Sequence, residues 1–106
     1  MVNASMERIG ILAILRAQPG RAGDVEAFLK SAQSLAQSET STLRWYAFKL
    51  DDSRFGIFDT FADDDGRQAH VAGEIARQLF AAAVELLAAP PSIEFAEIIA
   101  NKDWAS

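Results

Sequence analysis

The strand-like segments of this chain are apolar on both of their faces. A strand with one face in water alternates apolar and polar residues, because successive side chains point to opposite sides of the sheet. In the segment 7–17, both sets of alternating positions are instead apolar, and the segments 43–50, 54–61 and 92–100 share this pattern. The sequence therefore predicts a sheet that must be covered on both faces.

Helical periodicity fills the intervals between these strands. An amphipathic helix is expected over about 23–38, and the run 51–53 joins two strands into a hairpin. A second helix comes in two pieces, a first stretch that ends at about 72 and a second over 74–88, with Gly73 between them. The order βαββαβ predicts a ferredoxin-like α+β fold, with a four-stranded antiparallel sheet and its helices on one face.

Length and composition indicate one folded domain over residues 1–106, with its core at about 8–100. Hydrophobic residues make up 50% and charged residues 24%, the balance of a folded soluble protein. There is no cysteine, which excludes disulfides, a thiolate nucleophile and zinc–thiolate sites.

Charge and hydropathy also limit the partners. A net charge of −5 without any basic block argues against nucleic acid or an anionic membrane surface as a partner. No apolar stretch approaches the ~20 residues that cross a bilayer, and the N-terminus lacks a signal-peptide pattern. We therefore expect a cytoplasmic protein.

The apolar second face of the sheet predicts self-association. Four strands make a sheet about 19 Å wide, and two helices cover one such face. A bare apolar face of several hundred Å² would exceed what monomers usually expose. We therefore expect a homodimer packed sheet against sheet. The alternative is that the C-terminal tail or the split helix covers this face.

His70 is the only histidine, and its ordinary pKa near neutrality makes it the first candidate for proton transfer. At helical spacing its face contains Gly66, Ala69 and Gly73, small residues that would leave room for a cavity. The alternative is a surface histidine, or one that is hydrogen-bonded in the core.

Asp59 is expected in mid-strand on an otherwise apolar face, where a carboxylate must be paired or solvated. It precedes His70 by eleven residues on an adjacent element. A pair between the two across a pocket is therefore feasible, and it would raise the pKa of His70 and fix its tautomer. The alternatives place Asp59 at a sheet edge in water or beside Arg44.

Trp45 and Tyr46 are adjacent, so they point to opposite faces of their strand. One is expected in the core, and the other could line a pocket or the dimer seam. The run Asp63-Asp64-Asp65 lacks the alternating ligands of a calcium loop, and it is expected to cap the following helix. Arg67 can pair with either of the first two aspartates of this run.

The stretch FDTFADDDGRQAH at 58–70, the element order and the two-faced sheet resemble the antibiotic biosynthesis monooxygenase family over roughly residues 8–100. Members of this family often carry an acidic residue and an aromatic residue at the end of the third strand, then an acidic helix start and a histidine. Asp59, Phe61, Asp63 and His70 match these positions in order. Asp59 stands where Glu is commoner, Phe61 where Trp or Tyr is commoner, and Arg67 where Leu is usual.

The resemblance implies a small dimeric α/β barrel that oxygenates phenols, anthrones or quinols without metal or flavin, because the substrate itself supplies the electrons. The haem-degrading branch uses an Asn that the first strand lacks, so we expect no cofactor. His70 would deprotonate or orient the phenol, and Asp59 would support it. The side chains expected to border the substrate are Trp45, Tyr46, Phe61 and Arg67.

Two other functions stay open, because this fold hosts several activities. One is a small-molecule-binding or stress-response module without catalysis. The other is a non-redox isomerase.

Overall fold

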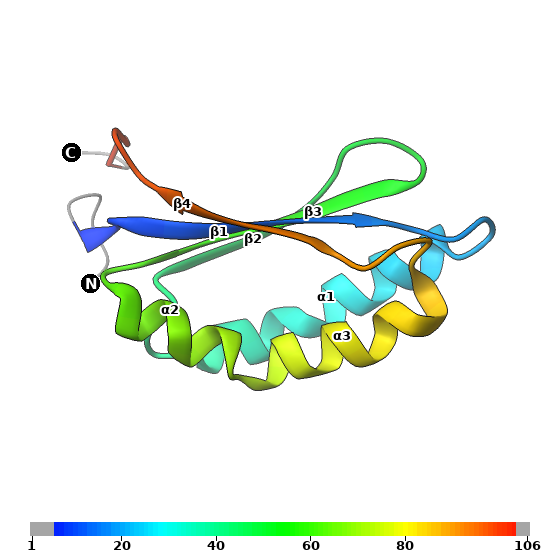
Figure 1. Cartoon of the computed structure of the whole chain (residues 1–106), viewed down its shortest axis with the longest axis horizontal. Coiled ribbons are helices and arrows are strands. Elements are labelled where there is room, and N and C mark those ends of the chain that lie inside the picture. The colour runs from blue at the N-terminus through cyan, green and yellow to red at the C-terminus, as the bar shows by residue number, and fades with distance from the viewer. Residues whose placement is uncertain (1–5, 104–106) are drawn as a thin grey trace.

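The computed structural model describes residues 6–103 and has the expected ferredoxin-like α+β fold (Figure 1). The expected polar start of the chain, at 1–6, and its tail, at 101–106, lie largely outside the described residues. The strands are β1 (Ile9–Arg16), β2 (Arg44–Lys49), β3 (Arg54–Phe61) and β4 (Ser92–Glu97). The helices are α1 (Ala22–Ser38), α2 (Asp64–Val71) and α3 (Glu74–Leu86).

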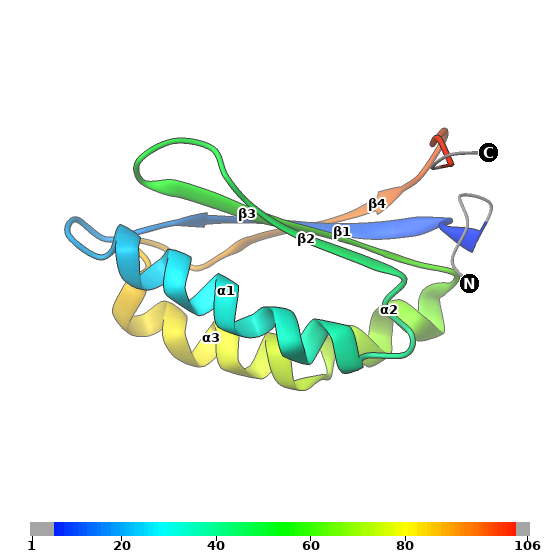
Figure 2. The same ribbon diagram turned by 180° about the vertical axis from the view of Figure 1, so that it is seen from behind.

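The strands form one antiparallel sheet in the order β2-β3-β1-β4, and the three helices lie on one face of it (Figures 1 and 2). Residues directly opposite each other in antiparallel strands share a face. Asp59 in β3 is opposite both Ile11 in β1 and Trp45 in β2, so these three side chains lie on the helix side. β1 and β3 are the central strands, and β2 and β4 are the edges.

The core lies between the helix side of the sheet and the apolar stripes of α1 and α3. In α1, every third or fourth residue is buried, which is the spacing that keeps side chains on one face of a helix. Leu15 and Phe55 from the central strands are almost fully buried against this stripe. The buried residues of α1 are Val25, Leu29, Ala32 and Ala36.

The last strand is shorter than expected. It was predicted over 92–100 but ends at Glu97, which pairs with Ile9, the first residue of β1. Beyond this pair one further hydrogen bond forms, from the backbone N–H of Ile98 to the carbonyl of Arg8 at 3.0 Å, and Ile99 is 94% exposed. The second half of the split helix also ends early, at Leu86, because Leu87 turns to form a bridge with Ala17.

The other face of the sheet is open and carries a set of apolar side chains, as the strand pattern predicts, alongside polar ones such as Arg44 and Glu94. Two of its aromatic rings lie against glycines of neighbouring strands, Phe58 against Gly10 and Phe48 against Gly56. The split helix lies on the opposite face, so the alternative in which it covers the open face is wrong (Figure 1). The apolar side chains of this open face are Leu12, Ile14, Tyr46, Phe48, Phe58 and Ala96.

Between residues 6 and 103, no helix is long and apolar enough to cross a membrane.

Candidate active site

The start of α2 fixes where His70 lies. Asp63 is the N-cap of this helix, and its Oδ1 accepts a hydrogen bond of 2.9 Å from the backbone N–H of Gly66. The capping role expected for the aspartate run is therefore confirmed at Asp63. Arg67 pairs with Asp64, one of the two partners expected for it, at 3.1 Å. Because α2 begins directly after β3, its last turn returns His70 over the helix side of the sheet.

His70 meets Asp59 there. Its Nε2 lies 2.9 Å from Oδ2 of Asp59, so the expected pair is present. Asp59 is 1% exposed and lies in a central strand, which rules out the alternative of a solvated edge position. Arg44 is not its partner either, because Arg44 lies on the open face and binds Glu7 at 3.2 Å.

The second nitrogen of His70 is held by a residue that the sequence did not single out. Nδ1 lies 2.7 Å from Oε1 of Glu39, the residue that follows α1. The hydroxyl of Thr42 donates a further hydrogen bond of 2.7 Å to the same carboxylate oxygen. An acidic residue at the start of a polar loop carries no distinctive sequence signal, since solvated loops are rich in such residues.

These two carboxylates decide the charge of His70. Burial by itself lowers the pKa of the imidazole, but the hydrogen bonds and charges of Asp59 and Glu39 outweigh burial and raise the pKa to about 9. At neutral pH both ring nitrogens therefore carry protons and donate. An imidazolium cannot accept a proton, so at neutral pH this raised pKa favours the other role expected of His70, which is to orient a bound molecule, over that of a base. The charged ring can also offset negative charge in the site.

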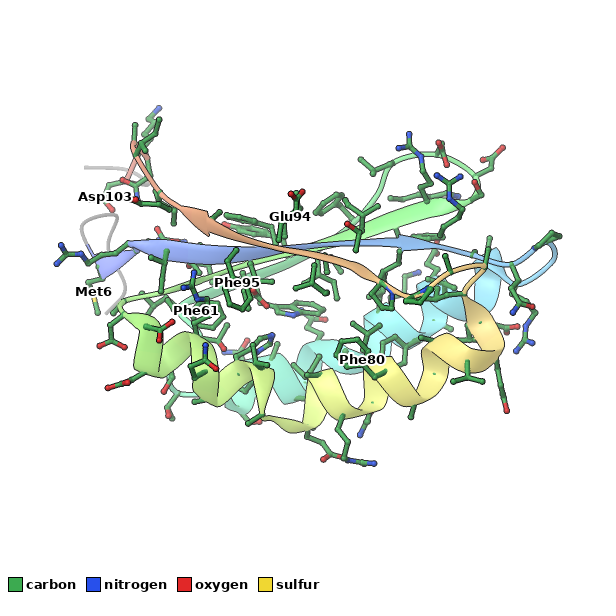
Figure 3. All side chains as sticks on the ribbon, in the orientation of Figure 1. Met6, Phe61, Phe80, Glu94, Phe95 and Asp103 are labelled. Carbon is green, nitrogen blue, oxygen red and sulfur yellow. The ribbon has the colours of Figure 1, made fainter. Side chains whose placement is uncertain are left out.

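A cavity of about 270 Å³ adjoins the pair, between the sheet and the helices α2 and α3. Its wall is apolar apart from Asp59 and His70, and Phe80 and Phe95 are half-exposed beside it (Figure 3). The second oxygen of Asp59, Oδ1, is buried and has no hydrogen-bond partner. A buried polar atom without a partner is rare, so Oδ1 keeps an acceptor capacity that no contact within the described residues uses.

The small residues of α2 border a second hollow, as the sequence predicts: Ala69, His70 and Gly73 line a pocket of about 320 Å³ beside the 39–42 loop. A Cβ on Gly66 would lie 3.3 Å from the backbone oxygen of Ser41, and one on Gly73 would lie 3.3 Å from Oε2 of Glu39. These glycines therefore allow close packing of α2 against the 39–42 loop. The apolar cavity of about 270 Å³ lies on the other side of His70, where its wall includes the small side chains of Ala13 and Ala76.

The four side chains expected to border the substrate are dispersed. Tyr46 lies on the open face and is 53% exposed, so it does not line this cavity. Trp45 lies on the helix side, but it borders a separate groove of about 580 Å³ between α1 and β2. Phe61 is fully buried, with its ring centroid 5.4 Å from that of His70. Arg67 lies over the ring of Phe95, 4.2 Å from its centroid, and so reaches the cavity wall indirectly.

Among residues 6–103, no cluster of three or more His, Asp or Glu side chains is arranged to hold a metal ion.

Comparison with known proteins finds similarity among solved structures. No protein-family model matches the chain, and no curated protein matches it. A protein of unknown function from Nitrosomonas europaea is 44% identical, and the match covers 97% of this chain and 100% of that one with a TM-score of 0.92. At this identity and coverage the two chains belong to one family.

Two more distant structures share the fold. A "putative antibiotic biosynthesis monooxygenase" from Caulobacter crescentus is 21% identical, over 90% of this chain and 92% of that one, with a TM-score of 0.74. A second protein of the same description, from Nitrosomonas europaea, is 10% identical, over 87% of this chain and 99% of that one, with a TM-score of 0.78.

Proposed function

Because the chain belongs to the family of the Nitrosomonas europaea protein of unknown function and has the fold of the antibiotic biosynthesis monooxygenases, we propose that it is a cofactor-independent monooxygenase. Its substrate would be a small aromatic or quinol-type molecule held in the cavity beside Asp59 and His70. The observation that carries the proposal is the buried Oδ1 of Asp59, an unpartnered acceptor beside an otherwise apolar cavity.

Asp59 is the base in this proposal. A phenolic O–H or an activated C–H of the substrate gives its proton to Oδ1, while the imidazolium of His70 donates to Oδ2 and offsets the charge of the site. This assignment reverses the roles implied by the family resemblance, in which His70 is the base and Asp59 supports it.

The substrate then supplies the electrons. Its carbanion or phenolate adds O₂ at carbon, and the protonated Asp59 returns the proton to give a hydroperoxide. Where that carbon keeps a hydrogen, as in an anthrone, loss of water leaves a carbonyl. One oxygen atom enters the product, the other leaves as water, and all the electrons come from the substrate.

Size and polarity of the cavity support a small aromatic ligand. Pockets for drug-sized ligands measure roughly 300–1,000 Å³, and this one is about 270 Å³. Because the walls are apolar, a bound aromatic ring would displace water from beside Asp59 and His70, which would strengthen the interaction between the imidazolium and the carboxylate.

Oxygen uptake with a panel of hydroquinones, naphthohydroquinones and anthrones tests the proposal. The wild type should consume O₂, and Asp59→Asn should lower turnover about 100-fold or more, the usual contribution of a positioned base. Asp52→Asn, in the exposed turn between β2 and β3, is the matched control and should keep full activity. Ligand binding without O₂ uptake would favour the binding module. A converted product without O₂ uptake would favour the isomerase.

We also propose that two copies associate through the open face of the sheet. Six apolar side chains lie on this face, and among residues 6–103 no helix covers it (Figure 2). Tyr46 is large and half-exposed there, which is typical of aromatic residues in interfaces. An exposed apolar face of this kind is uncommon in monomers, so a sheet-to-sheet homodimer is the expected assembly.

A further inference from the structure

The contacts of His70 extend the site beyond the cavity, to the loop that follows α1. We propose that Glu39 is a positioning residue of this site, which accepts the Nδ1–H of His70 and so aims the Nε2–H at Oδ2 of Asp59. Held in this way, the ring engages one oxygen of Asp59 and leaves Oδ1 free for the substrate. The catalytic part of this inference rests on the proposed function.

Two hydrogen bonds and the space beside Gly73 position Glu39. Its own backbone N–H donates to the carbonyl of Ala36 at 3.1 Å, which anchors it to the last turn of α1. The hydroxyl of Thr42 donates to Oε1 at 2.7 Å, and the absence of a side chain at Gly73 leaves room for Oε2. The side chain of Glu39 is 20% exposed, so its charge is only partly screened by water.

No nearby charged group replaces Glu39. Asp59 faces His70 from β3, and Arg67 precedes His70 by one turn on α2 but is bound to Asp64. Glu74, at the start of α3, lines the same polar pocket as Glu39 and His70, but it is bound to Arg77. Within the described residues, the two charged groups seen to bond to the ring are therefore Asp59 and Glu39.

The two carboxylates on opposite sides of the ring therefore have different roles. Glu39 holds the ring orientation and stabilises its positive charge, while Asp59 faces the cavity. A side chain that merely tied α1 to α2 would contribute to stability, and removing its charge would lower the pKa of His70 but leave the turnover of the folded enzyme unchanged.

Glu39→Gln tests this role, because the amide oxygen can still accept the Nδ1–H but carries no charge. The pKa of His70, followed by NMR of its ring, should fall by about one unit or more. Turnover should fall about tenfold with little change in KM, since the substrate does not touch this side chain. Glu26→Gln is the matched control: Glu26 lies on α1 and pairs with Lys30, and neither quantity should change.

A second variant tests the same role in case Glu39→Gln does not fold. Thr42→Val keeps the charge of Glu39 but removes the hydroxyl that holds its carboxylate in place, so turnover should fall in this variant too, but by less than in Glu39→Gln. If the pKa of His70 in the folded Glu39→Gln variant stays within a few tenths of the wild-type value, or if turnover is unchanged, the positioning role is wrong.

The two proposals fail in different ways. A wild type that consumes no O₂ with any compound of the panel overturns the proposed function, while a lowered pKa of His70 in Glu39→Gln would still support the structural part of this inference. An active wild type with an unchanged pKa in Glu39→Gln overturns the positioning role and leaves the proposed function standing.

Discussion

Nε2 of His70 lies 2.9 Å from Oδ2 of Asp59, and this contact binds a nearly buried ring to a carboxylate in the middle of the sheet. Because a second carboxylate holds Nδ1, the ring lies between two negative groups. Burial of charge is unfavourable unless it is paired and hydrogen-bonded, and here both nitrogens have partners. The fold therefore favours the charged form of the imidazole.

Stability should accordingly depend on pH on the alkaline side. The pKa of His70 is raised to about 9 in the folded chain, against an ordinary value of about 6.5 in the unfolded chain. Its contribution is fully present below pH ~6.5 and is lost as the pH rises through about 9. Urea unfolding should show a loss of roughly 2 kcal/mol between pH 6.5 and 9.5.

The variant His70→Gln isolates this effect. The glutamine side chain cannot be protonated, so the unfolding free energy of this variant should be lower than that of the wild type at pH 6.5. It should then change little between pH 6.5 and pH 9. An equally steep alkaline loss in His70→Gln would assign the pH dependence to other groups.

Two glycines under aromatic rings should differ in their tolerance of a methyl group. A Cβ on Gly10 would lie 2.7 Å from the backbone oxygen of Asp59, so β1 and β3 must separate to admit it. A Cβ on Gly56 meets the ring of Phe48, which lies on the open face and can swing away. Gly10→Ala should lower the unfolding free energy by about 2 kcal/mol, and Gly56→Ala by less. Denaturant midpoints of the two variants decide the order, and the reverse order contradicts the argument.

A charge on the open face should separate the proposed dimer. Tyr46→Lys places an ammonium group at the expected seam, where a second copy would bury it without a partner. Sedimentation at micromolar concentration should show two chains for the wild type and one for this variant. Val84→Lys is the control, because Val84 is 81% exposed on α3, on the other side of the sheet. A wild type that sediments as one chain, or a dimer lost only in Val84→Lys, would place the interface elsewhere or remove it.

Filling the cavity should abolish ligand binding without disturbing the pair beside it. Ala76→Phe adds a ring to the cavity wall, whereas Ala81→Phe adds the same ring at an exposed position of the same helix. Binding of 1-naphthol, followed by its fluorescence, should weaken at least tenfold in the first variant and not in the second. Equal affinities for the two variants would show that the probe binds outside the cavity.

The periodicity of apolar residues predicts most of this fold because each element is encoded locally. The two-faced strands, the stripe of α1 and the break at Gly73 can all be read without knowing the partners of each element. The central pair of the site can also be predicted from the sequence. Asp59 interrupts an apolar face and His70 is the one histidine, so each is conspicuous in its own segment.

What the sequence could not provide depends on contacts between segments. Glu39 and His70 are 31 residues apart and meet only because α1 and α2 end beside each other. The choice between Trp45 and Tyr46 follows from the register of β2 on β3, which no single strand encodes. The position of the apolar cavity depends on how α3 packs, whereas Gly73, one of the small residues that suggested a hollow, borders the separate pocket beside the 39–42 loop.

The central place of β1 has a consequence for how the chain folds. Both neighbours of this first strand come later in the sequence, β3 after one helix and β4 after all three. The long segments between β1 and its partners must close before the strands can pair, and this closure costs conformational entropy before any pairing stabilises the chain. Chains rich in such distant pairings fold slowly. Until β4 arrives, one side of β1 presents free backbone donors and acceptors to any other strand. The sheet is thus completed by its last strand, and an incompletely folded chain carries an exposed edge prone to aggregation.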